Sequence, residues 1–444
     1  MVTNTFLIQT RAKFVLATAL SFGATQSALA GSQPLSVRSS LTWYTVGTAQ
    51  EQVNDSPLNP NNSVLEIESQ IGAIDIRPNL KADSGQFQLV ARPQFKMLAT
   101  KSTVNDKLST ERPKSSAHWI EAYGNLTASD KVQVSYGLQN YQWGAAESFN
   151  PSNRIFHETI DGKGLLYTVE GRSIARSNLS WTKNINTVLM SETEQVKDAS
   201  EFRSEEVFQT RSLMKHEINW NSGADYFGVV FGAPEKGSQW VGEYFNLTLP
   251  EGLSIYADAS HFKNSEAWYP VYETSPLAPA QTVQMRQSKL ANKKVYTIAV
   301  GGFRYSFEGG SDLRFEYIAN AAGWTMDESK MAMLALDPKN QLQLPDYKTN
   351  LKRILKPGLE YRGQKYGLAS LRIPDALYTK DLVLYGRVLR SLTDFSTAYY
   401  GSLELGFWSA STFLVSAYMS SGAPDSELRG VISTSLTAGL RQDF

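Results

Sequence analysis

The last fifteen residues, Gly430-Val-Ile-Ser-Thr-Ser-Leu-Thr-Ala-Gly-Leu-Arg-Gln-Asp-Phe444, alternate between two kinds of side chain. One side of an extended strand would carry Ile432, Thr434, Leu436, Ala438, Leu440 and Phe444, with Gln442 as an interruption. The other side would carry Ser433, Ser435, Thr437, Gly439, Arg441 and Asp443. Such a strand can present one face to lipid and the other to water, as a membrane strand requires. A half-buried strand of a soluble sandwich has the same alternation, so this segment alone leaves both folds open.

The same two-faced pattern recurs along the chain. Apolar and polar positions alternate in Phe87–Met97, Lys131–Tyr141, Leu313–Tyr317, Tyr399–Phe407 and Phe413–Met419. Beyond residue 30, no stretch approaches the roughly 18 consecutive apolar residues of a transmembrane helix. The repetition therefore favours an all-β fold, a transmembrane antiparallel up-and-down barrel.

Two classes of connection alternate between the candidate strands. Short ones, rich in Gly, Asn, Asp and Pro, are expected at 81–86, 128–130, 182–184, 221–224, 250–252 and 308–311. Long polar ones are expected at 47–66, 100–116, 144–164, 193–210, 264–292 and 324–350. This alternation predicts short periplasmic turns at one rim and long extracellular loops at the other. Nothing resembling a linker divides the chain, so residues 31–444 are predicted to form a single barrel domain.

The strand count contains one inconsistency. Nineteen strand-like segments can be counted, whereas bacterial single-chain barrels have an even number of strands. The region 350–395 is the most suspect, because its connections are all short; it includes the candidate strand 352–362. We therefore predict eighteen strands, with sixteen as the alternative.

The first thirty residues have the order of a secretory signal peptide. Basic Arg11 and Lys13 precede the apolar run Phe14–Phe22, and Ala28-Leu-Ala30 supplies a small-residue cleavage site. We expect residues 1–30 to be removed and the mature chain to start at Gly31. An uncleaved membrane anchor is the alternative, but the apolar run is short for a span.

Composition excludes several classes of function. The 43 basic and 43 acidic residues give a formal net charge of zero, which argues against nucleic acid as a partner. The absence of cysteine excludes a thiolate nucleophile, a thiolate zinc site and an iron–sulfur cluster. His118, His157, His216 and His261 are widely separated, and no catalytic or phosphate-binding motif accompanies them. We predict no enzyme activity, no metal and no cofactor, although a barrel can assemble a site across strands, as outer-membrane phospholipase does.

Two segments resemble bacterial outer-membrane barrels. The chain stops at the aromatic Phe444 with its strand still running, which resembles their terminal strand. A second segment is similar to a Trp-Gly…Asn-Pro signature in a group that includes relatives of porins and alginate-export channels. Its positions are matched here by Gln139, Trp143, Gly144, Glu147, Asn150, Pro151 and Asn153. The resemblance implies a place in the outer membrane of a Gram-negative bacterium, in contact with its lipid. It also implies assembly by the barrel-assembly machinery, with Phe444 as the assembly signal.

The signature segment also has a physical meaning of its own. Gly144 permits a sharp departure of the backbone from the strand, and Asn150-Pro151 is a turn signal. The chain could therefore fold inward as a constriction. The candidate residues of this loop are Trp143, Gly144, Glu147, Asn150, Pro151, Asn153 and Arg154. The alternative is that Trp143 belongs to an interfacial aromatic girdle and that the loop is ordered rim structure.

The alternation also predicts which charged side chains line the lumen. The candidates are Arg92, Lys96, Lys131, Arg304, Arg314, Glu316, Glu360, Arg362, Arg387, Glu404 and Arg441. A modest excess of arginine is compatible with anionic or sugar-like solutes. The alternative is that these groups pair with one another across strands.

Two functions fit these features. The first is a porin-like channel for small hydrophilic, anionic or sugar-like solutes, or for a polyanionic polymer. The second is a plugged surface barrel whose long loops bind a polysaccharide or an envelope protein. The position of the long loops decides between them.

Overall fold

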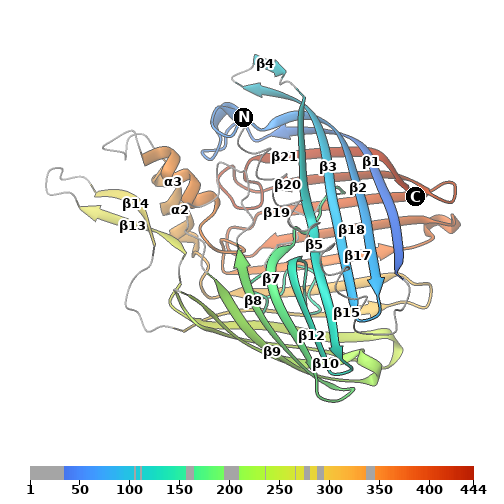
Figure 1. The fold of residues 1–444 in the computed structure, drawn as a ribbon. Helices are drawn as coiled ribbons and strands as arrows, with labels where there is room; N and C mark the ends of the chain where they lie inside the picture. The colour runs from blue at the N-terminus through green and yellow to red at the C-terminus, as the bar shows by residue number, and fades with distance from the viewer. Residues whose placement is uncertain are drawn as a thin grey trace, which may run out of the picture.

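The computed structural model describes residues 35–104, 107–110, 113–156, 165–194, 210–235, 237–265, 267–274, 281–287, 295–336 and 346–444. The expected signal peptide lies outside these residues. Within them, eighteen strands form one antiparallel wall (Figure 1). They are β1 (Ser36–Gln52), β2 (Glu68–Ser84), β3 (Phe87–Val104), β5 (Lys114–Ser129), β6 (Val132–Gln139), β7 (Arg172–Ser180), β8 (Ile185–Glu194), β9 (Arg211–Trp220), β10 (Asp225–Pro234), β11 (Trp240–Thr248), β12 (Leu253–Lys263), β15 (Val295–Ser306), β16 (Asp312–Asn320), β17 (Lys365–Ile373), β18 (Leu382–Ser391), β19 (Thr397–Gly406), β20 (Ser411–Ser421) and β21 (Ile432–Asp443).

The wall closes because its first and last strands pair. β1 pairs with β2 on one side and with β21 on the other, where Thr42 lies opposite Asp443. The prediction of an up-and-down barrel with eighteen strands is confirmed. An even number of strands brings the start of β1 and the end of β21 to the same rim, which also carries the short connections and is called the turn rim here. The opposite rim is the loop rim.

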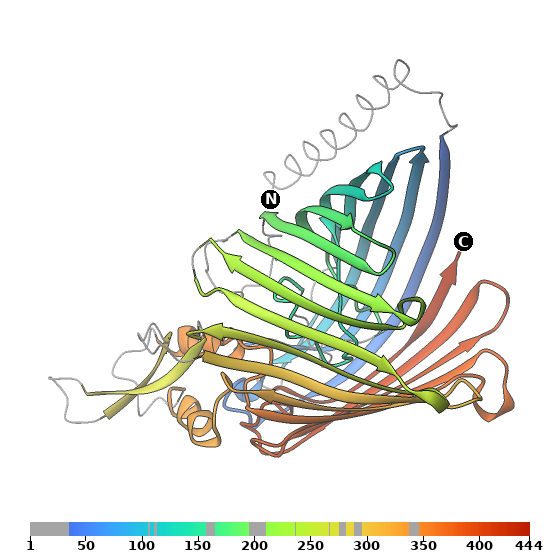
Figure 2. The same ribbon diagram turned by 90° about the horizontal axis from the view of Figure 1, so that it is seen from below.

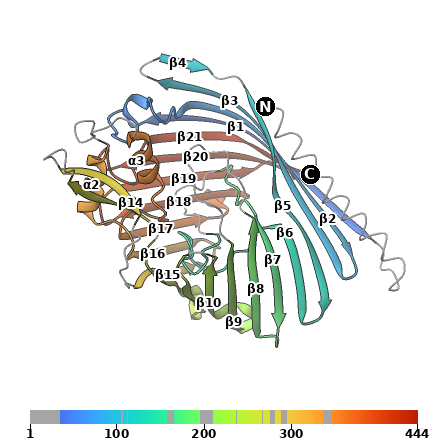
Figure 3. The ribbon, with the colours of Figure 1, turned by 60° about the vertical axis from the view of Figure 1, so that its left-hand side comes forward.

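The other described elements take no part in closing the wall, although β4 belongs to the same sheet. β4 (Lys107–Thr110) pairs only with β3, and β13 (Trp268–Thr274) pairs with β14 (Gln281–Gln287) as a separate hairpin. This hairpin and the helices α2 (Met326–Leu334) and α3 (Asp346–Leu355) gather at one end of the barrel, the loop rim (Figure 3). Four short 3-10 turns are η2 (Pro60–Asn62), η4 (Asn221–Gly223), η5 (Pro250–Gly252) and η7 (Ala376–Tyr378).

The predicted strand at 352–362 is wrong. Its first residues end helix α3, and the remainder is irregular until β17 begins at Lys365. Leu351 and Ile354 are fully buried and stand three residues apart, a spacing that places them on one face of a helix. Pro357 and Gly358 then prevent the helix from continuing. Removing this segment from the nineteen candidates leaves the eighteen strands observed.

The alternation of side chains separates the outside of the barrel from its interior. Phe95 and Met97 on β3 are exposed on the outside, whereas Gln94, the residue before Phe95, is buried inside. Phe413 and Met419 on β20 alternate in the same way with buried Leu414. No described helix is long and apolar enough to cross a membrane.

Two apolar clusters lie within this framework. The larger joins inner-wall residues of strands between β7 and β19 to the segment that follows β6, with Phe149, Ile155 and Phe156 contributed by that segment. The smaller lies at the loop rim, where Leu58, Trp324 and Leu351 join the β1–β2 loop to α2, α3 and the β13–β14 hairpin. The second cluster is called the rim cap.

Deleting Phe444 should reduce the amount of folded barrel in cells. The Phe444 amide and carbonyl both bond to Leu41 on β1, at 2.8 and 2.9 Å, while its ring is 65% exposed. The ring is thus accessible from outside the barrel, and its role as an assembly signal stays a prediction. Folded yield is measured by the heat-dependent mobility shift on gels, with Phe444→Tyr as a variant that retains a ring. Equal yields for the deletion and the parent would contradict the proposed role.

Candidate functional site

The described residues between β6 and β7, which are 140–156 and 165–171, run into the barrel and are called the inward loop. Near its start, the Asn140 amide donates to Glu121 on β5 at 3.1 Å. Towards its end, the Leu166 carbonyl accepts a bond from Arg77 on β2 at 2.8 Å. Figure 2 shows the teal segment between opposite walls.

The signature residues form a compact turn at the start of this loop. Gly144 has a φ of +91°, a conformation that favours glycine. The Asn150 side chain accepts a bond from the Ala146 amide at 3.1 Å, and Asn153 accepts one from Phe156 at 3.1 Å. Pro151 lies between these two asparagines. The predicted turn at Asn150-Pro151 is therefore present.

Trp143 lies in the interior and not at a membrane interface. Its side chain is 7% exposed, and its indole nitrogen donates to the Ser152 hydroxyl at 2.8 Å. It also belongs to the larger apolar cluster. The geometry fits the inward fold of the loop and not the girdle alternative.

Two wall carboxylates hold the backbone of the loop. Glu316 on β16 accepts bonds from the amides of Glu147 and Ser148, at 2.5 and 2.9 Å. Asp258 on β12 accepts bonds from the Ser152 amide at 2.6 Å and its hydroxyl at 2.9 Å. These carboxylates, called the wall clamps, are 4% and 1% exposed. Each carboxylate therefore accepts two hydrogen bonds from the loop at a site closed to water.

The Glu147 side chain extends the attachment to three further wall residues. Its carboxylate accepts bonds from the Tyr385 hydroxyl on β18 and, at 2.6 Å, from the Ser370 hydroxyl on β17. It also pairs with Arg314 on β16 at 3.3 Å. Arg314 in turn donates to the Ala145 carbonyl. The loop is thereby joined to the wall opposite the strands from which it emerges.

Glu147 and Arg154 are not brought together as an exposed acid and base. The Arg154 guanidinium lies over the Phe262 ring on β12, 4.1 Å from its centre. The Arg154 carbonyl accepts a bond from Arg211 on β9 at 2.6 Å. The residues predicted for a constriction are therefore mostly engaged with the wall and with one another.

The predicted lumen residues fall into three groups. Some pair with acids: Arg92 with Glu121, Arg304 with Asp312, and Arg441 with Glu404. Arg314 and Glu316 hold the inward loop, and Arg387 lies 4.4 Å above the centre of the Tyr400 ring. Lys96 shares the inner face of β3 with Gln94, Lys131 lies in the short turn before β6, and Glu360 and Arg362 lie in the irregular segment after α3. The expectation that Lys131, Glu360 and Arg362 occupy strand positions is wrong.

A cavity of about 470 Å³ lies beside the inward loop, below the rim cap, and is called the vestibule. Its polar lining includes Arg362, Arg387, Arg429, Glu360 and Glu427, with the rings of Tyr400 and Tyr418. Its apolar lining includes Leu58, Leu165, Leu355, Leu359 and Val431. The wall of the vestibule is formed by β18–β21 and β1. No group of three or more acidic or histidine side chains suited to a metal occurs among the described residues.

Two carboxylates, Glu427 and Asp394, connect the segment before β17, the β18–β19 loop and the β20–β21 loop by hydrogen bonds at the edge of the vestibule. Glu427 accepts bonds from the amides of Arg362 and Gly363, at 2.6 and 3.1 Å, and from the Tyr366 hydroxyl. Asp394 accepts bonds from the Glu427 amide at 2.7 Å and the Ser396 hydroxyl at 2.6 Å. Burial raises the pKa of Asp394, but the bonds from Glu427 and Ser396 outweigh burial and lower that pKa below its ordinary value of 3.8.

The contact made by Asp394 should loosen only in strong acid. Because its pKa is lowered on folding, its stabilising contribution is complete above the ordinary value of 3.8 and is lost as the pH falls through the folded value. Pepsin cleavage between Gly422 and Val431 should therefore accelerate as the pH is lowered from about 5 to about 2. Asp394→Asn should be cleaved faster than the parent at the upper end of this range, with little further change. Asp425→Asn in the same loop is the control, and an unchanged cleavage profile for Asp394→Asn would contradict this assignment.

Comparison with known proteins finds similarity of fold. No family model matches the chain, and none of the curated proteins matches it. Among solved structures, Acinetobacter baumannii OccAB1 matches with a TM-score of 0.55 at 10% identity, over 92% of this chain and 96% of that one. Pseudomonas aeruginosa OccK2 (OpdF) in complex with glucuronate matches with a TM-score of 0.51 at 10% identity, over 92% and 96%. A BenF-like porin from Pseudomonas fluorescens matches with a TM-score of 0.50 at 8% identity, over 92% and 98%.

The chain has a porin fold. Identities of this size establish the fold only. They do not identify a solute or the membrane that contains the protein. The expected resemblance to outer-membrane porins is thereby confirmed at the level of architecture, whereas the signature and the terminal Phe444 remain observations on this sequence. Sequence reasoning missed Asp258, Ser370 and Tyr385 as partners of the inward loop. The available signal was their inward position on predicted strands.

Proposed function

We propose that this protein is an outer-membrane channel of a Gram-negative bacterium that passes small hydrophilic solutes and prefers anionic or sugar-like ones. The observation that carries the proposal is the inward loop, bonded to both sides of a closed barrel and leaving the vestibule open beside it. The outward apolar faces of the strands support a membrane location. The porin fold supports a channel.

The charged side chains that line the vestibule support the preference for anions. Three arginines, Arg362, Arg387 and Arg429, line it together with Glu360 and Glu427. Three hydrogen-bond donors engage the Glu427 carboxylate, which leaves that acid less able to repel an anion. Arg429 also pairs with Asp55 at 4.0 Å, so Arg362 and Arg387 supply most of the positive field, which low-dielectric walls strengthen. Tyrosine rings in the same lining suit the faces of sugars.

The size of the vestibule supports small solutes over a polymer. Its volume of about 470 Å³ lies within the range of small-molecule sites. An extended polymer would have to displace the inward loop, which several buried hydrogen bonds attach to the wall. We therefore favour solutes of the size of a single sugar acid. The OccK2 structure contains glucuronate, which makes glucuronate a suitable first probe.

A second function, a plugged surface barrel, has one observation in its favour. The rim cap packs α2, α3 and the β13–β14 hairpin around buried Trp324 at the loop rim. A packed cap of this kind resembles a lid more than a set of open loops. A barrel of this type would bind a polysaccharide or an envelope protein through that surface and would conduct no ions.

The test is the insertion of the purified full-length protein into a planar bilayer. We expect discrete conductance steps and partial block by glucuronate. In a salt gradient, the reversal potential should lie closer to the equilibrium potential of the anion than to that of the cation. Arg387→Gln should shift the reversal potential towards cations, whereas Arg304→Gln, remote from the vestibule and paired with Asp312, should shift it less. Absence of conductance from correctly folded protein would favour the plugged barrel. Recovery of the protein in the soluble periplasmic fraction would overturn both.

A further inference from the structure

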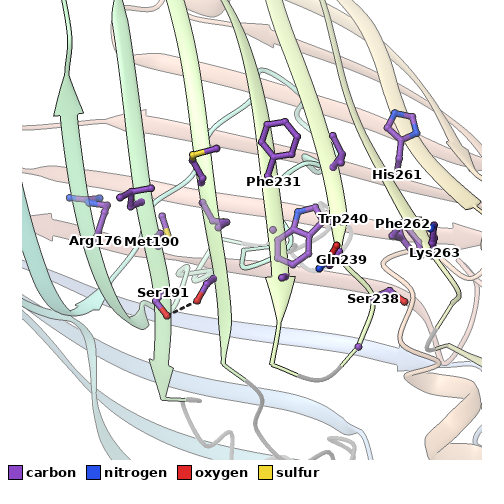
Figure 4. A pocket seen from close by; sticks show the side chains of 18 of the residues that line it. Arg176, Met190, Ser191, Phe231, Ser238, Gln239, Trp240, His261, Phe262 and Lys263 are labelled. Atoms are coloured by element: carbon purple, nitrogen blue, oxygen red, sulfur yellow. Dashed lines mark hydrogen bonds between the residues drawn. The ribbon is translucent and has the colours of Figure 1, made fainter.

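A groove of about 1180 Å³ lies on the outside of the barrel across β6–β12 and the start of β15 (Figure 4). Its exposed apolar side chains come from six strands and are Val134, Leu189, Met214, Phe231, Val241 and Val295. The buried residues Met190, Leu213, Trp240 and Phe262, which alternate with them, also line the groove because it lies directly on the wall. The described part of the inward loop contributes nothing to the lining. The groove therefore belongs to the face that meets the membrane.

The groove opens towards the loop rim. Gly237, Ser238 and Gln239 of the β10–β11 turn line its end, together with Lys263 and Asn264 where β12 stops. Long loops lie on the extracellular side of barrels of this kind. The apolar part of the groove thus lies at the depth of the outer leaflet, and its polar end lies at the depth of the lipid headgroups.

The polar end has a distinct chemistry. The hydroxyls of Ser191 and Ser212 bond to each other at 2.9 Å, as Figure 4 shows by a dashed line. Deeper in the groove, opposite Val241, His261 bonds to the Thr297 hydroxyl at 2.9 Å and lies 3.5 Å from the Glu243 carboxylate, so this acid has a partner on the outer face. Lys263 is exposed at the lip, and the described residues that line the lip include no carboxylate. One outward cation among hydroxyl and amide groups suits a headgroup that carries both phosphate and sugar hydroxyls.

We propose that this groove binds one acylated sugar-phosphate lipid of the outer leaflet. An acyl chain lies along Met214, Phe231 and Val241, and the phosphate lies beside Lys263. On a convex barrel surface an acyl chain contacts protein on one side only, whereas the groove allows contact on several sides. Each methylene group that is buried adds to the affinity for the lipid. The inference rests on the membrane location proposed above.

The experiment uses the full-length folded protein in a mild detergent. It is mixed with lipid A or, separately, with phosphatidylglycerol, and bound lipid is counted by native mass spectrometry. We expect one lipid A per barrel. Met214→Trp and Leu189→Trp fill the groove by two independent routes and should each weaken retention about tenfold or more. Lys263→Gln should weaken it by a smaller factor. Ala438→Trp, an exposed outward position on β21, is the matched control and should retain lipid A as the parent does.

Three results would overturn the proposal. They are no bound lipid A on the folded parent, equal retention by both groove-filling variants and the parent, and equal or stronger binding of phosphatidylglycerol. The heat-dependent gel shift shows which variants are folded, so a misfolded variant is replaced by the other. Conductance of the same samples is recorded separately. A barrel that conducts without retaining lipid A refutes only this inference, and a folded barrel that does not conduct refutes the channel.

Discussion

Replacing Glu316 by glutamine should release the inward loop and convert a steady channel into a fluctuating one of larger mean conductance. The carboxylate accepts bonds from the Glu147 and Ser148 amides and from the Tyr256 hydroxyl, all inside the barrel. Glutamine keeps the shape but has no charge and only one acceptor oxygen. Loss of charge-assisted bonds of this kind costs about 2 kcal/mol, which corresponds to roughly a 30-fold rise in the population of the released loop.

The measurement is single-channel recording of Glu316→Gln beside two further variants. Asp258→Ala removes the second wall clamp, and the double variant should exceed either single one because both act on the same segment. Glu404→Gln is the matched control, since Glu404 pairs with Arg441 and makes no bond to the inward loop. If Glu316→Gln and Glu404→Gln gave the same conductance and noise as the parent, the loop would not be held by the clamps.

The architecture could be predicted from the sequence because the alternation of side chains is a local property. A strand with one face in lipid and the other inside must alternate at every second residue, and the pattern is repeated eighteen times. The error at 352–362 has the same origin. Alternating apolar residues in a short segment suit either a strand or the edge of a helix, and only the burial of Leu351 and Ile354 together distinguishes the two.

The candidate site was predictable only in part. Gly144 and Asn150-Pro151 predict a turn through their own backbone preferences, so their role can be inferred from the sequence. The partners of the loop are not, because Asp258, Glu316 and Ser370 lie 106 to 223 residues away from the groups they bond. An inward charged residue on a predicted strand can face solute or hold a loop, and alternation does not separate these roles. Arg154 illustrates the difference, since a residue expected to face solute lies instead on the Phe262 ring.

Replacing Gly144 by alanine should disrupt the inward loop. The residue has a φ of +91°, where an L-residue is strained by roughly 1–2 kcal/mol. An added Cβ would also lie 2.1 Å from the Asn150 side-chain oxygen and 2.6 Å from an Asp258 oxygen. One methyl group therefore displaces both the turn and a wall clamp. The expected result is a folded barrel with raised, unstable conductance.

Gly301→Ala on β15 is the matched control for this change. Its φ is not in the left-handed range, and an added Cβ there meets no atom within 4 Å. Both variants should show the heat-dependent mobility shift of a closed barrel, because Gly144 lies outside the wall strands and the nearest atoms to its added Cβ belong to side chains, while Gly301 has open space. Their channels should differ: Gly301→Ala should conduct as the parent does, and Gly144→Ala should not. Parent-like conductance from folded Gly144→Ala protein would mean that the turn after Trp143 does not define the channel, and the vestibule wall would then have to supply the constriction.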